Sequence, residues 1–496
     1  MMWRFGLADS TFEPLLTSHW ALAIALCLPL VLGGLAAVWP PKRMWVVALA
    51  CAPLLTSGLL LLVDFTQIGL LRWQGEVLGV SIGLRLNGVS ILLLLLTQWL
   101  GAASALYTPG LLNVSPPERL ARWLWPLMGV VVSALSLVWL ATDLITLYLA
   151  LELMGLAAVG MLLLSGKTPA LFASMRYLLL TLVGSLAYLL GVALLLGYWG
   201  QVDLAGLAQV VEPGPVTWVA AALIGGGLAL KAALFPLHAW LSPVHASAWT
   251  PVSALHAGLV VKASLFVLLQ LWSILLPDTF WAPRLVAWMG MLAIIWGGLI
   301  AWRAESLKTL VASSTVAQLG YLMVVFPLLL GPNVGPLAKA LAWEGFWLQL
   351  MGHALAKAAM FLAAGNLILA TGETTLKGLA GCSRKLPLSL LVFGIASVTL
   401  MGLPPSAGFT AKWLLLQAMV ISQQWWAVAA LLIGTLLTAA YVFRFFRYSF
   451  METAPRHHYQ PLSPGMDIIA LCLALAAFVL GLLAHFPLEL LHGGSL

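Results

Sequence analysis

Long unbroken apolar runs of about 18 to 25 residues recur from one end of the chain to the other, and they constrain the fold more than any other feature. Because a bilayer offers no partners for backbone N–H and C=O groups, only helices and closed barrels can span it. Barrel strands would be short and would alternate polar with apolar residues, whereas these runs are continuous. The runs therefore predict membrane-spanning α-helices.

The composition supports the same class of protein. Hydrophobic residues make up 62% of the 496 residues and charged residues only 8%, which is too little polar surface to cover a soluble core. The net charge of +7 does not indicate a nucleic-acid partner, because most basic residues lie in the short loops between apolar runs. We expect an all-α polytopic membrane protein.

The apolar runs predict about 14 transmembrane helices, with no soluble domain between them. The first run is long enough to span the membrane and no small-residue cleavage site follows it, so we expect it to be retained. The expected helices cover residues 18–39, 44–63, 86–107, 124–142, 143–165, 170–199, 217–236, 250–275, 283–303, 306–330, 341–370, 386–420, 424–447 and 466–487. Residues 64–85 alternate polar and apolar side chains and predict an extramembrane hairpin, and residues 452–464 predict a solvated loop.

Two of the expected spans contain helix breakers. Pro236 interrupts the seventh, and the twelfth contains Pro404 and Pro405, so both helices should be discontinuous. Interrupted helices at matching places in two halves of a chain indicate an inverted repeat with its ion site at the midplane. We therefore expect two inverted five-helix repeats, helices 4–8 and 9–13. The predicted divisions are residues 1–123 (helices 1–3 with the hairpin), 124–275 (first repeat), 283–447 (second repeat) and 448–496 (a cytoplasmic loop and helix 14).

The distribution of lysine and arginine predicts the orientation. Loops that follow odd-numbered helices carry fourteen of these residues and the other side carries five. Positively charged loops stay in the cytoplasm, so both termini should lie on the non-cytoplasmic side of the plasma membrane, which is the inner membrane where the cell has two.

Several kinds of chemistry have no sequence support. The four cysteines are widely separated and no Cys/His ligand spacing is present, so we expect no metal site and no cofactor. No GxxxxGK[ST] loop occurs, so ATP is not hydrolysed on this chain. We predict no catalytic residues here, and whether the chain is a subunit of an enzyme stays open.

A few ionisable residues lie inside apolar runs, where each is a candidate functional residue. A lone buried lysine often has an ordinary structural explanation, such as an ion pair or a snorkelling side chain, but four lysines with a carboxylate on five helices form a hydrophilic row. Histidines on the same spans extend the set. The predicted proton pathway consists of Glu152, Lys231, Lys262, His256, His353, Lys357 and Lys412, with His238, His245, Lys308 and Glu344 as secondary candidates.

The row predicts proton transfer because of desolvation. Burial disfavours the charged form of a side chain, and an opposite charge nearby restores it. A paired Glu and Lys is therefore bistable, since the lysine keeps its proton while the pair holds and releases it when the carboxylate withdraws. Glu152 with Lys231 is our candidate pair. His353 and Lys357 are four residues apart and share one helical face, which suits a relay. His353 and His256 could equally be structural core histidines, and His238 and His245 could be interfacial.

The residues around these lysines resemble a known family. The segment LALKAALFPLHAWLSPVHASAWTPVSALHAGLVVKA is similar to the signature of the antiporter-like subunits of respiratory complex I, membrane-bound hydrogenases and Mrp-type cation/proton antiporters. ESLKTLVASSTVAQLGYL, HALAKAAMFLAAG and GLPPSAGFTAKWLLLQ resemble three further motifs, in the family's order. The chain departs from the common pattern at Asn87, Ser242, Pro243 and Trp249.

The resemblance implies fourteen helices, two inverted repeats and broken helices 7 and 12. It also implies roles for individual residues: Glu152 is the helix 5 glutamate, Lys231 its helix 7 partner, and Lys262 the helix 8 lysine. Lys357 falls in the region of the helix 11 lysine, Lys412 is the exit residue, and Lys308 is a basic residue near the start of helix 10.

We expect a proton-translocating membrane subunit of a larger complex, without catalytic chemistry of its own. The complex could be an NADH:quinone oxidoreductase, a hydrogenase or an Mrp-type assembly, whose other membrane subunits would be the partners. One alternative is the D subunit of an Mrp-type Na+/H+ antiporter, with sodium sharing the path. Others are an ion-coupling membrane partner of a soluble protein, as in inorganic carbon uptake, and a structural subunit that conducts nothing.

Overall fold

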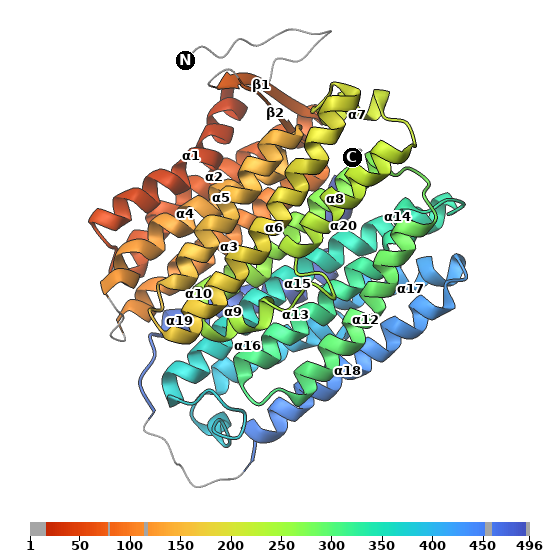
Figure 1. Ribbon diagram of the computed structural model, residues 1–496. Helices are drawn as coiled ribbons and strands as arrows, with labels where there is room; N and C mark the ends of the chain where they lie inside the picture. Colours follow the sequence, from red (N-terminus) through yellow and green to blue (C-terminus); the bar gives the residue numbers. More distant parts are fainter. Residues whose placement is uncertain (1–15, 78–79, 114–117, 452–458, 493–496) are drawn as a thin grey trace.

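The computed structural model describes residues 16–77, 80–113, 118–451 and 459–492, and this part of the chain is almost entirely helical. The N-terminal 15 residues and most of the predicted loop at 452–464 lie outside it. Figure 1 shows long helices running side by side across one bundle, with α1 and α2 at one edge and α18 at the far edge. The predicted all-α fold is confirmed.

Twelve helical spans in the described part are long and apolar enough to cross a membrane. Ten are single helices: α1 (Leu16–Val38), α2 (Met44–Ile68), α3 (Gly88–Leu112), α4 (Glu118–Leu140), α5 (Leu144–Leu163), α6 (Thr168–Trp199), α12 (Trp281–Arg303), α15 (Pro336–Thr371), α18 (Trp425–Ser449) and α19 (Pro464–Leu482). Two are composite: α10 (Thr250–Leu255) continues through the π-helix η1 (His256–Val260) into α11 (Val261–Leu275), and α13 (Leu307–Val324) is followed by α14 (Phe326–Leu330).

The two expected broken spans complete the predicted set of fourteen. The seventh consists of α8 (Pro215–Lys231) and α9 (Leu241–Ser247), and the twelfth consists of α16 (Pro387–Met401) and α17 (Ala407–Ile421). The prolines lie in the non-helical segments between the halves, as predicted, and the Phe235–Pro236 and Pro404–Pro405 peptide bonds are cis.

The predicted extramembrane hairpin is present, but it begins later than expected. Strands β1 (Leu71–Val77) and β2 (Val80–Leu86) pair antiparallel, with Leu71 opposite Leu86. The predicted start at Asp64 is wrong, because α2 continues to Ile68 with the Asp64 side chain buried.

Short helices that the hydrophobic pattern did not predict complete the chain. They are α7 (Leu204–Val210), α20 (His485–His492) and the 3₁₀ turn η2 (Cys382–Arg384). The N-terminus of α7 is capped by Asp203, which accepts from the Gly206 N–H at 2.9 Å.

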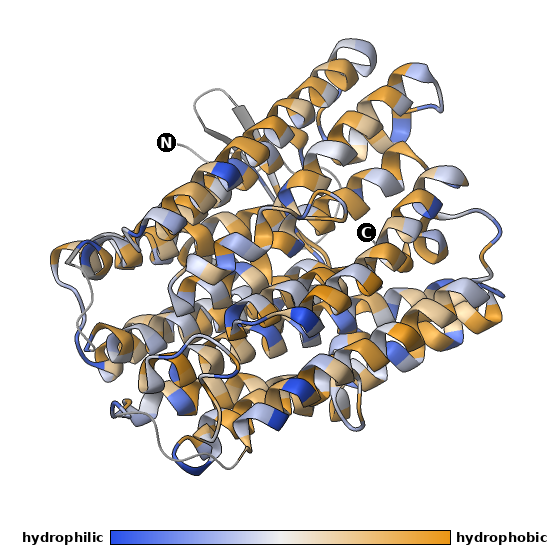
Figure 2. Cartoon of the chain, turned by 60° about the horizontal axis from the view of Figure 1, so that its bottom comes forward, coloured by the Kyte–Doolittle hydropathy of each residue, from blue (hydrophilic) through white to orange (hydrophobic). Residues whose placement is uncertain are grey.

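Helix α15 runs through the middle of the bundle, where it packs against α10, α16, α17 and α19. Its residues from Gly345 to Leu367 are all buried. By contrast α1, α2, α6, α12 and α18 expose large apolar side chains. Figure 2 shows hydrophobic residues along the helices, with hydrophilic residues gathered mainly at the turns and at a few places within the bundle. Such a surface fits hydrocarbon, and the buried centre is where a polar row must lie.

Candidate functional site

The predicted pair, Glu152 on α5 and Lys231 on α8, is in direct contact. Lys231 Nζ lies 3.0 Å from Glu152 Oε1, and the lysine side chain is 5% exposed and the glutamate side chain 17% exposed. The Ser185 hydroxyl on α6 donates to the same Glu152 oxygen. Three helices therefore meet at one buried charge pair.

Lys231 is the last residue of α8, so the pair lies where the helix breaks. Ala233, two residues on, has φ 53°, a left-handed conformation that ends the helix. The Trp240 indole N–H donates to the Leu230 carbonyl at 3.0 Å, which satisfies an acceptor next to the break. The break is thus held by a specific contact, and Lys231 is placed at its edge.

Lys262 on α11 is fully buried and lies just after the π-helix. Its Nζ donates to the Ala257 carbonyl, within η1, at 2.6 Å. A π-helix widens the turn and removes regular i to i+4 bonds, which leaves carbonyls available as acceptors. The lysine is therefore satisfied by backbone of its own span, and no carboxylate of the described residues forms an ion pair with it.

Two predicted histidines, His245 and His256, form a buried ring cluster. The ring of His256 lies edge-on to Tyr177, Trp240 and His245, with centroid distances of 5.3, 5.9 and 5.4 Å. His245 also packs on Phe361 at 4.9 Å. The ring nitrogens of both histidines lack a hydrogen-bond partner among the described residues. The His245 side chain is fully buried, whereas His238 is half-buried and stacks on Phe235.

Lys357 and His353 occupy the middle of α15. Lys357 Nζ donates to the Val311 carbonyl at 2.7 Å and to the Ser314 hydroxyl, both on α13. His353 is buried four residues earlier on the same helix, and neither of its ring nitrogens has a hydrogen-bond partner among the described residues. The two side chains thus lie one turn apart in the buried centre of α15.

Lys412 on α17 closes the second break. Its Nζ donates to the carbonyls of Leu400 and Met401, at 2.9 and 3.1 Å, which are the last residues of α16. The ammonium also lies 4.5 Å from the ring centroid of Tyr321 on α13. One lysine therefore supplies donors to the carbonyls at the end of α16 that the break leaves free.

Two glutamines that the sequence analysis did not select are bonded to each other and to the carbonyl that Lys412 binds. Gln349 on α15 donates to Gln318 on α13 at 3.0 Å, and Gln318 donates to the Leu400 carbonyl at 3.3 Å. That carbonyl also accepts from Lys412. Buried amides at single positions of apolar helices carry no charge signal, which is why the sequence did not reveal them.

Two secondary candidates lie at other places. Lys308, at the start of α13, donates to the Ala248 carbonyl after α9 at 2.6 Å, so it connects α13 with the end of α9. Glu344 on α15 pairs at 2.8 Å with His492 of α20, whose side chain is 58% exposed. No ion pair of the described residues joins Glu344 to a lysine, and its secondary role in the pathway stays a prediction.

A second polar cluster, also missed, joins four spans. The Asp467 carboxylate on α19 accepts from Asn366 on α15 at 2.7 Å and from Ser389 on α16 at 2.6 Å. Asn366 in turn accepts from the buried Tyr107 hydroxyl on α3 at 2.7 Å. Asp467 falls in the first turn of α19, and the sequence analysis did not select it. We name Tyr107, Asn366, Ser389 and Asp467 the Asp467 cluster.

No group of three His, Cys, Asp or Glu side chains within the described residues is arranged to hold a metal ion. The lysines of the row are instead spread along the bundle, each bonded to at least one neighbour, whereas the ring nitrogens of His256 and His353 have no hydrogen-bond partner among the described residues. This arrangement suits stepwise movement of a small charge rather than binding of one cofactor.

The comparisons with known proteins identify the family. Residues 141–438 match the family described as NADH:quinone oxidoreductase/Mrp antiporter, transmembrane. The chain belongs to this family of antiporter-like membrane subunits, and it is a multi-pass membrane protein.

Named relatives come from both branches of the family. The chain is 32% identical over 360 residues to NADH-quinone oxidoreductase subunit N of Desulforudis audaxviator, covering 68% of this chain and 70% of the relative. It is 30% identical over 375 residues to Na(+)/H(+) antiporter subunit A1 of Staphylococcus haemolyticus, covering 72% of this chain but 45% of that longer protein.

Solved structures agree on the fold. A chain of the Mrp complex from Dietzia sp. superposes with a TM-score of 0.83 at 23% identity, with 97% of each chain covered. A chain of respiratory complex I from Thermus thermophilus superposes with a TM-score of 0.79 at 24% identity, covering 95% of this chain and 99% of that one. These similarities extend over nearly the whole chain.

Proposed function

We propose that this chain moves protons across the membrane as one subunit of a multisubunit complex. The observation that carries the proposal is the buried ion pair of Glu152 and Lys231 at the break of helix 7. A pair at a helix break can separate by a small movement, because the backbone beside it is not held in a regular helical ladder. Separation leaves an unpaired buried ammonium, which disfavours the charged lysine.

The proposed path continues through the other buried lysines. When Lys231 loses its partner, its proton passes toward Lys262, with His256 and water as carriers. His353 connects Lys262 with Lys357, and the Ser314, Gln318 and Gln349 side chains line the way toward Lys412. Since each of these lysines is held by carbonyl or hydroxyl acceptors rather than by a carboxylate, each can exist neutral without leaving an unpaired negative charge.

The proposed partners are other membrane subunits. The similar chains of known structure belong to an Mrp complex, to respiratory complex I and to a membrane-bound sulfane sulfur reductase, all of which are assemblies. We place the basic loops in the cytoplasm and both termini on the opposite side, following the distribution of lysine and arginine. Division into repeats at residues 124–275 and 283–447 is part of the same proposal.

An Na+/H+ antiporter subunit is the second candidate function. It is favoured by the similarity to Na(+)/H(+) antiporter subunit A1 and by the superposition on an Mrp complex chain. In this case sodium would use part of the same row. A coupling partner of a soluble protein and a structural subunit remain the rivals from other classes.

The test is proton transport by the intact complex reconstituted in liposomes, with a pH dye inside and with sodium present or absent. A respiratory subunit should move protons when the redox reaction runs, whether or not sodium is present. An antiporter subunit should move protons only against a sodium gradient. Full transport in Lys262→Ala, where the assembly is still intact, would support a structural subunit and reject both candidates. Co-purifying flavin and iron–sulfur subunits would indicate a redox complex.

A further inference from the structure

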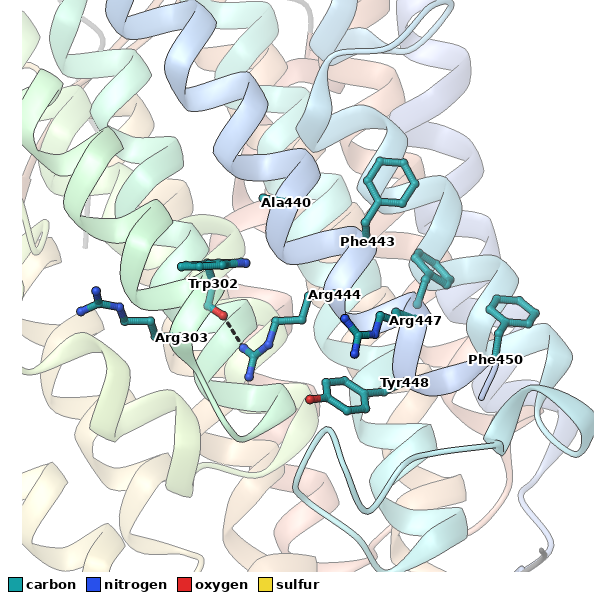
Figure 3. Close-up of a pocket in the computed structure, with 9 residues that line it drawn as sticks. Trp302, Arg303, Ala440, Phe443, Arg444, Arg447, Tyr448 and Phe450 are labelled. Carbon is teal, nitrogen blue, oxygen red and sulfur yellow. Dashed lines mark hydrogen bonds between the residues drawn. The ribbon is translucent and has the colours of Figure 1, made fainter. Parts of the chain in front are cut away.

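We infer that the hollow between the ends of α12 and α18 binds the headgroup of an anionic phospholipid. The hollow measures about 910 Å³ and opens at the surface of the bundle. Figure 3 shows the guanidinium groups of Arg444 and Arg447 and the hydroxyl of Tyr448 gathered beside Trp302, while Arg303 points away in this view. This site lies apart from the buried lysine row, so it stands independently of the proposed function.

The two arginines differ in what they already bind. Arg444 donates to the Trp302 carbonyl and, at 2.7 Å, to the Ala304 carbonyl, which fixes its guanidinium at the C-terminus of α12. Arg447 is exposed and has no hydrogen bond or ion pair with the described residues. Guanidinium groups present several N–H donors in a planar fork that matches phosphate oxygens. One arginine held by backbone carbonyls and one exposed arginine therefore form a cationic site that can accept an anion.

The same groove has an apolar wall that fits acyl chains. Phe443 and Phe450 of α18 are 65% and 63% exposed, and Trp302 of α12 is 46% exposed. Leu436 is two turns before Phe443 on the same face of α18 and is 71% exposed. A phosphate at Arg444 and Arg447 would leave its acyl chains along this face. Free phosphate would satisfy only the arginines, whereas a phospholipid also covers the apolar wall.

Positive charge at helix ends is common in membrane proteins because it sets topology, and topology alone does not require the arginines to converge. Here one guanidinium is held by backbone carbonyls and aromatic rings surround the site, which is typical of basic pockets that bind lipid headgroups. Charge complementarity therefore favours an anionic lipid over a zwitterionic one.

The test is native mass spectrometry of the full chain, released from detergent micelles after titration with phosphatidylglycerol, phosphatidylcholine or inorganic phosphate. We expect phosphatidylglycerol to be retained in preference to phosphatidylcholine. Arg447→Gln should weaken that retention about fivefold, and Arg444→Gln/Arg447→Gln should weaken it further. Arg284→Gln is the matched control, because Arg284 lies at the opposite end of α12, where it stacks on Phe280. It should retain the lipid as the unmodified chain does.

Three results would overturn the inference. Equal retention of the two lipids, or undiminished retention by the Arg447→Gln chain, would show that the arginines do not select the headgroup. Displacement of phosphatidylglycerol by inorganic phosphate would show a site for free anions. Finally, a photo-crosslinker in place of Phe443 that captures another protein subunit in the intact complex, instead of lipid, would show that this face is a subunit interface.

Discussion

Glu152 Oε1 and Lys231 Nζ lie 3.0 Å apart at the residue where α8 stops being helical. Removing one partner of a buried ion pair leaves an uncompensated buried charge, which lowers the stability of a protein by about 3–5 kcal/mol. At the edge of a helix break the lysine has freedom that it would lack in mid-helix. The pair in contact and the separated pair therefore differ strongly in electrostatic energy, and the backbone at the break permits both arrangements.

Gly227→Ala tests whether the close approach of α6 and α8 positions that pair. A Cβ at Gly227 would lie 2.2 Å from the Gly184 carbonyl oxygen of α6, so the two helices would have to separate. We expect a loss of about 1–3 kcal/mol in stability and reduced proton transport, because Lys231 is one turn further along α8. Gly226→Ala is the control, as a Cβ there meets nothing within 4 Å. Thermal unfolding in detergent is the measurement; equal melting of the two variants would contradict the account.

Gln318→Leu tests the proposed path between Lys357 and Lys412. The change removes the hydrogen bonds to Gln349 and to the Leu400 carbonyl, while the side chain keeps a similar volume. The rate of proton transport should fall about tenfold, because a tenfold change corresponds to about 1.4 kcal/mol, roughly the net contribution of one hydrogen bond. Gln270→Leu on α11, a buried amide outside the row, should transport normally. The idea fails if both leucine variants transport equally well in proteoliposomes.

Substitutions of Lys412 separate its structural role from proton transfer. Arginine keeps the donors to the Leu400 and Met401 carbonyls but does not lose its proton in a protein. We expect Lys412→Arg to fold and assemble but not to transport, and Lys412→Met to lose stability as well because the carbonyls are left unsatisfied, at about 1–3 kcal/mol each. Normal transport by the arginine variant would mean that only a fixed charge is needed at this position.

The Asp467 cluster should contribute to stability rather than to transport. Asp467→Ala removes the acceptor that Asn366 and Ser389 share, so the melting temperature should fall. The free energy of unfolding should decrease by about 1.5–3 kcal/mol, the range for hydrogen bonds to a charged group. The Asp467→Ala and Ser389→Ala changes share a contact, so their combined effect should be less than the sum. Additive losses in a double-mutant cycle would show that the cluster does not act as one unit.

The sequence revealed the charged part of the site because a lysine in the middle of an apolar run has no solvent to reach. Lys231, Lys262, Lys357 and Lys412 are all buried, and both breaks were predicted because proline cannot continue a helix. Contact between Glu152 and Lys231 was only a candidate, since sequence spacing does not tell which helices touch.

Other features left no comparable signal. Gln318 and Gln349 are neutral, and η1 has no sequence signature that distinguishes it from an ordinary turn. Glu344, a secondary candidate, pairs with His492, whereas Asp467, which the sequence analysis did not select, accepts from side chains of two other helices. Tertiary packing decides both cases.

The most direct test of the central claim is proton uptake by liposomes that contain the intact complex with Glu152→Gln, with Lys231→Ala and with both changes. If the two side chains work as one switch, each single variant should lose nearly all transport, and the double variant should lose no more. Glu344→Gln, a carboxylate outside the row, should transport normally in the same preparation. Transport by the Lys231→Ala complex at the unmodified rate, with assembly intact, would contradict the account.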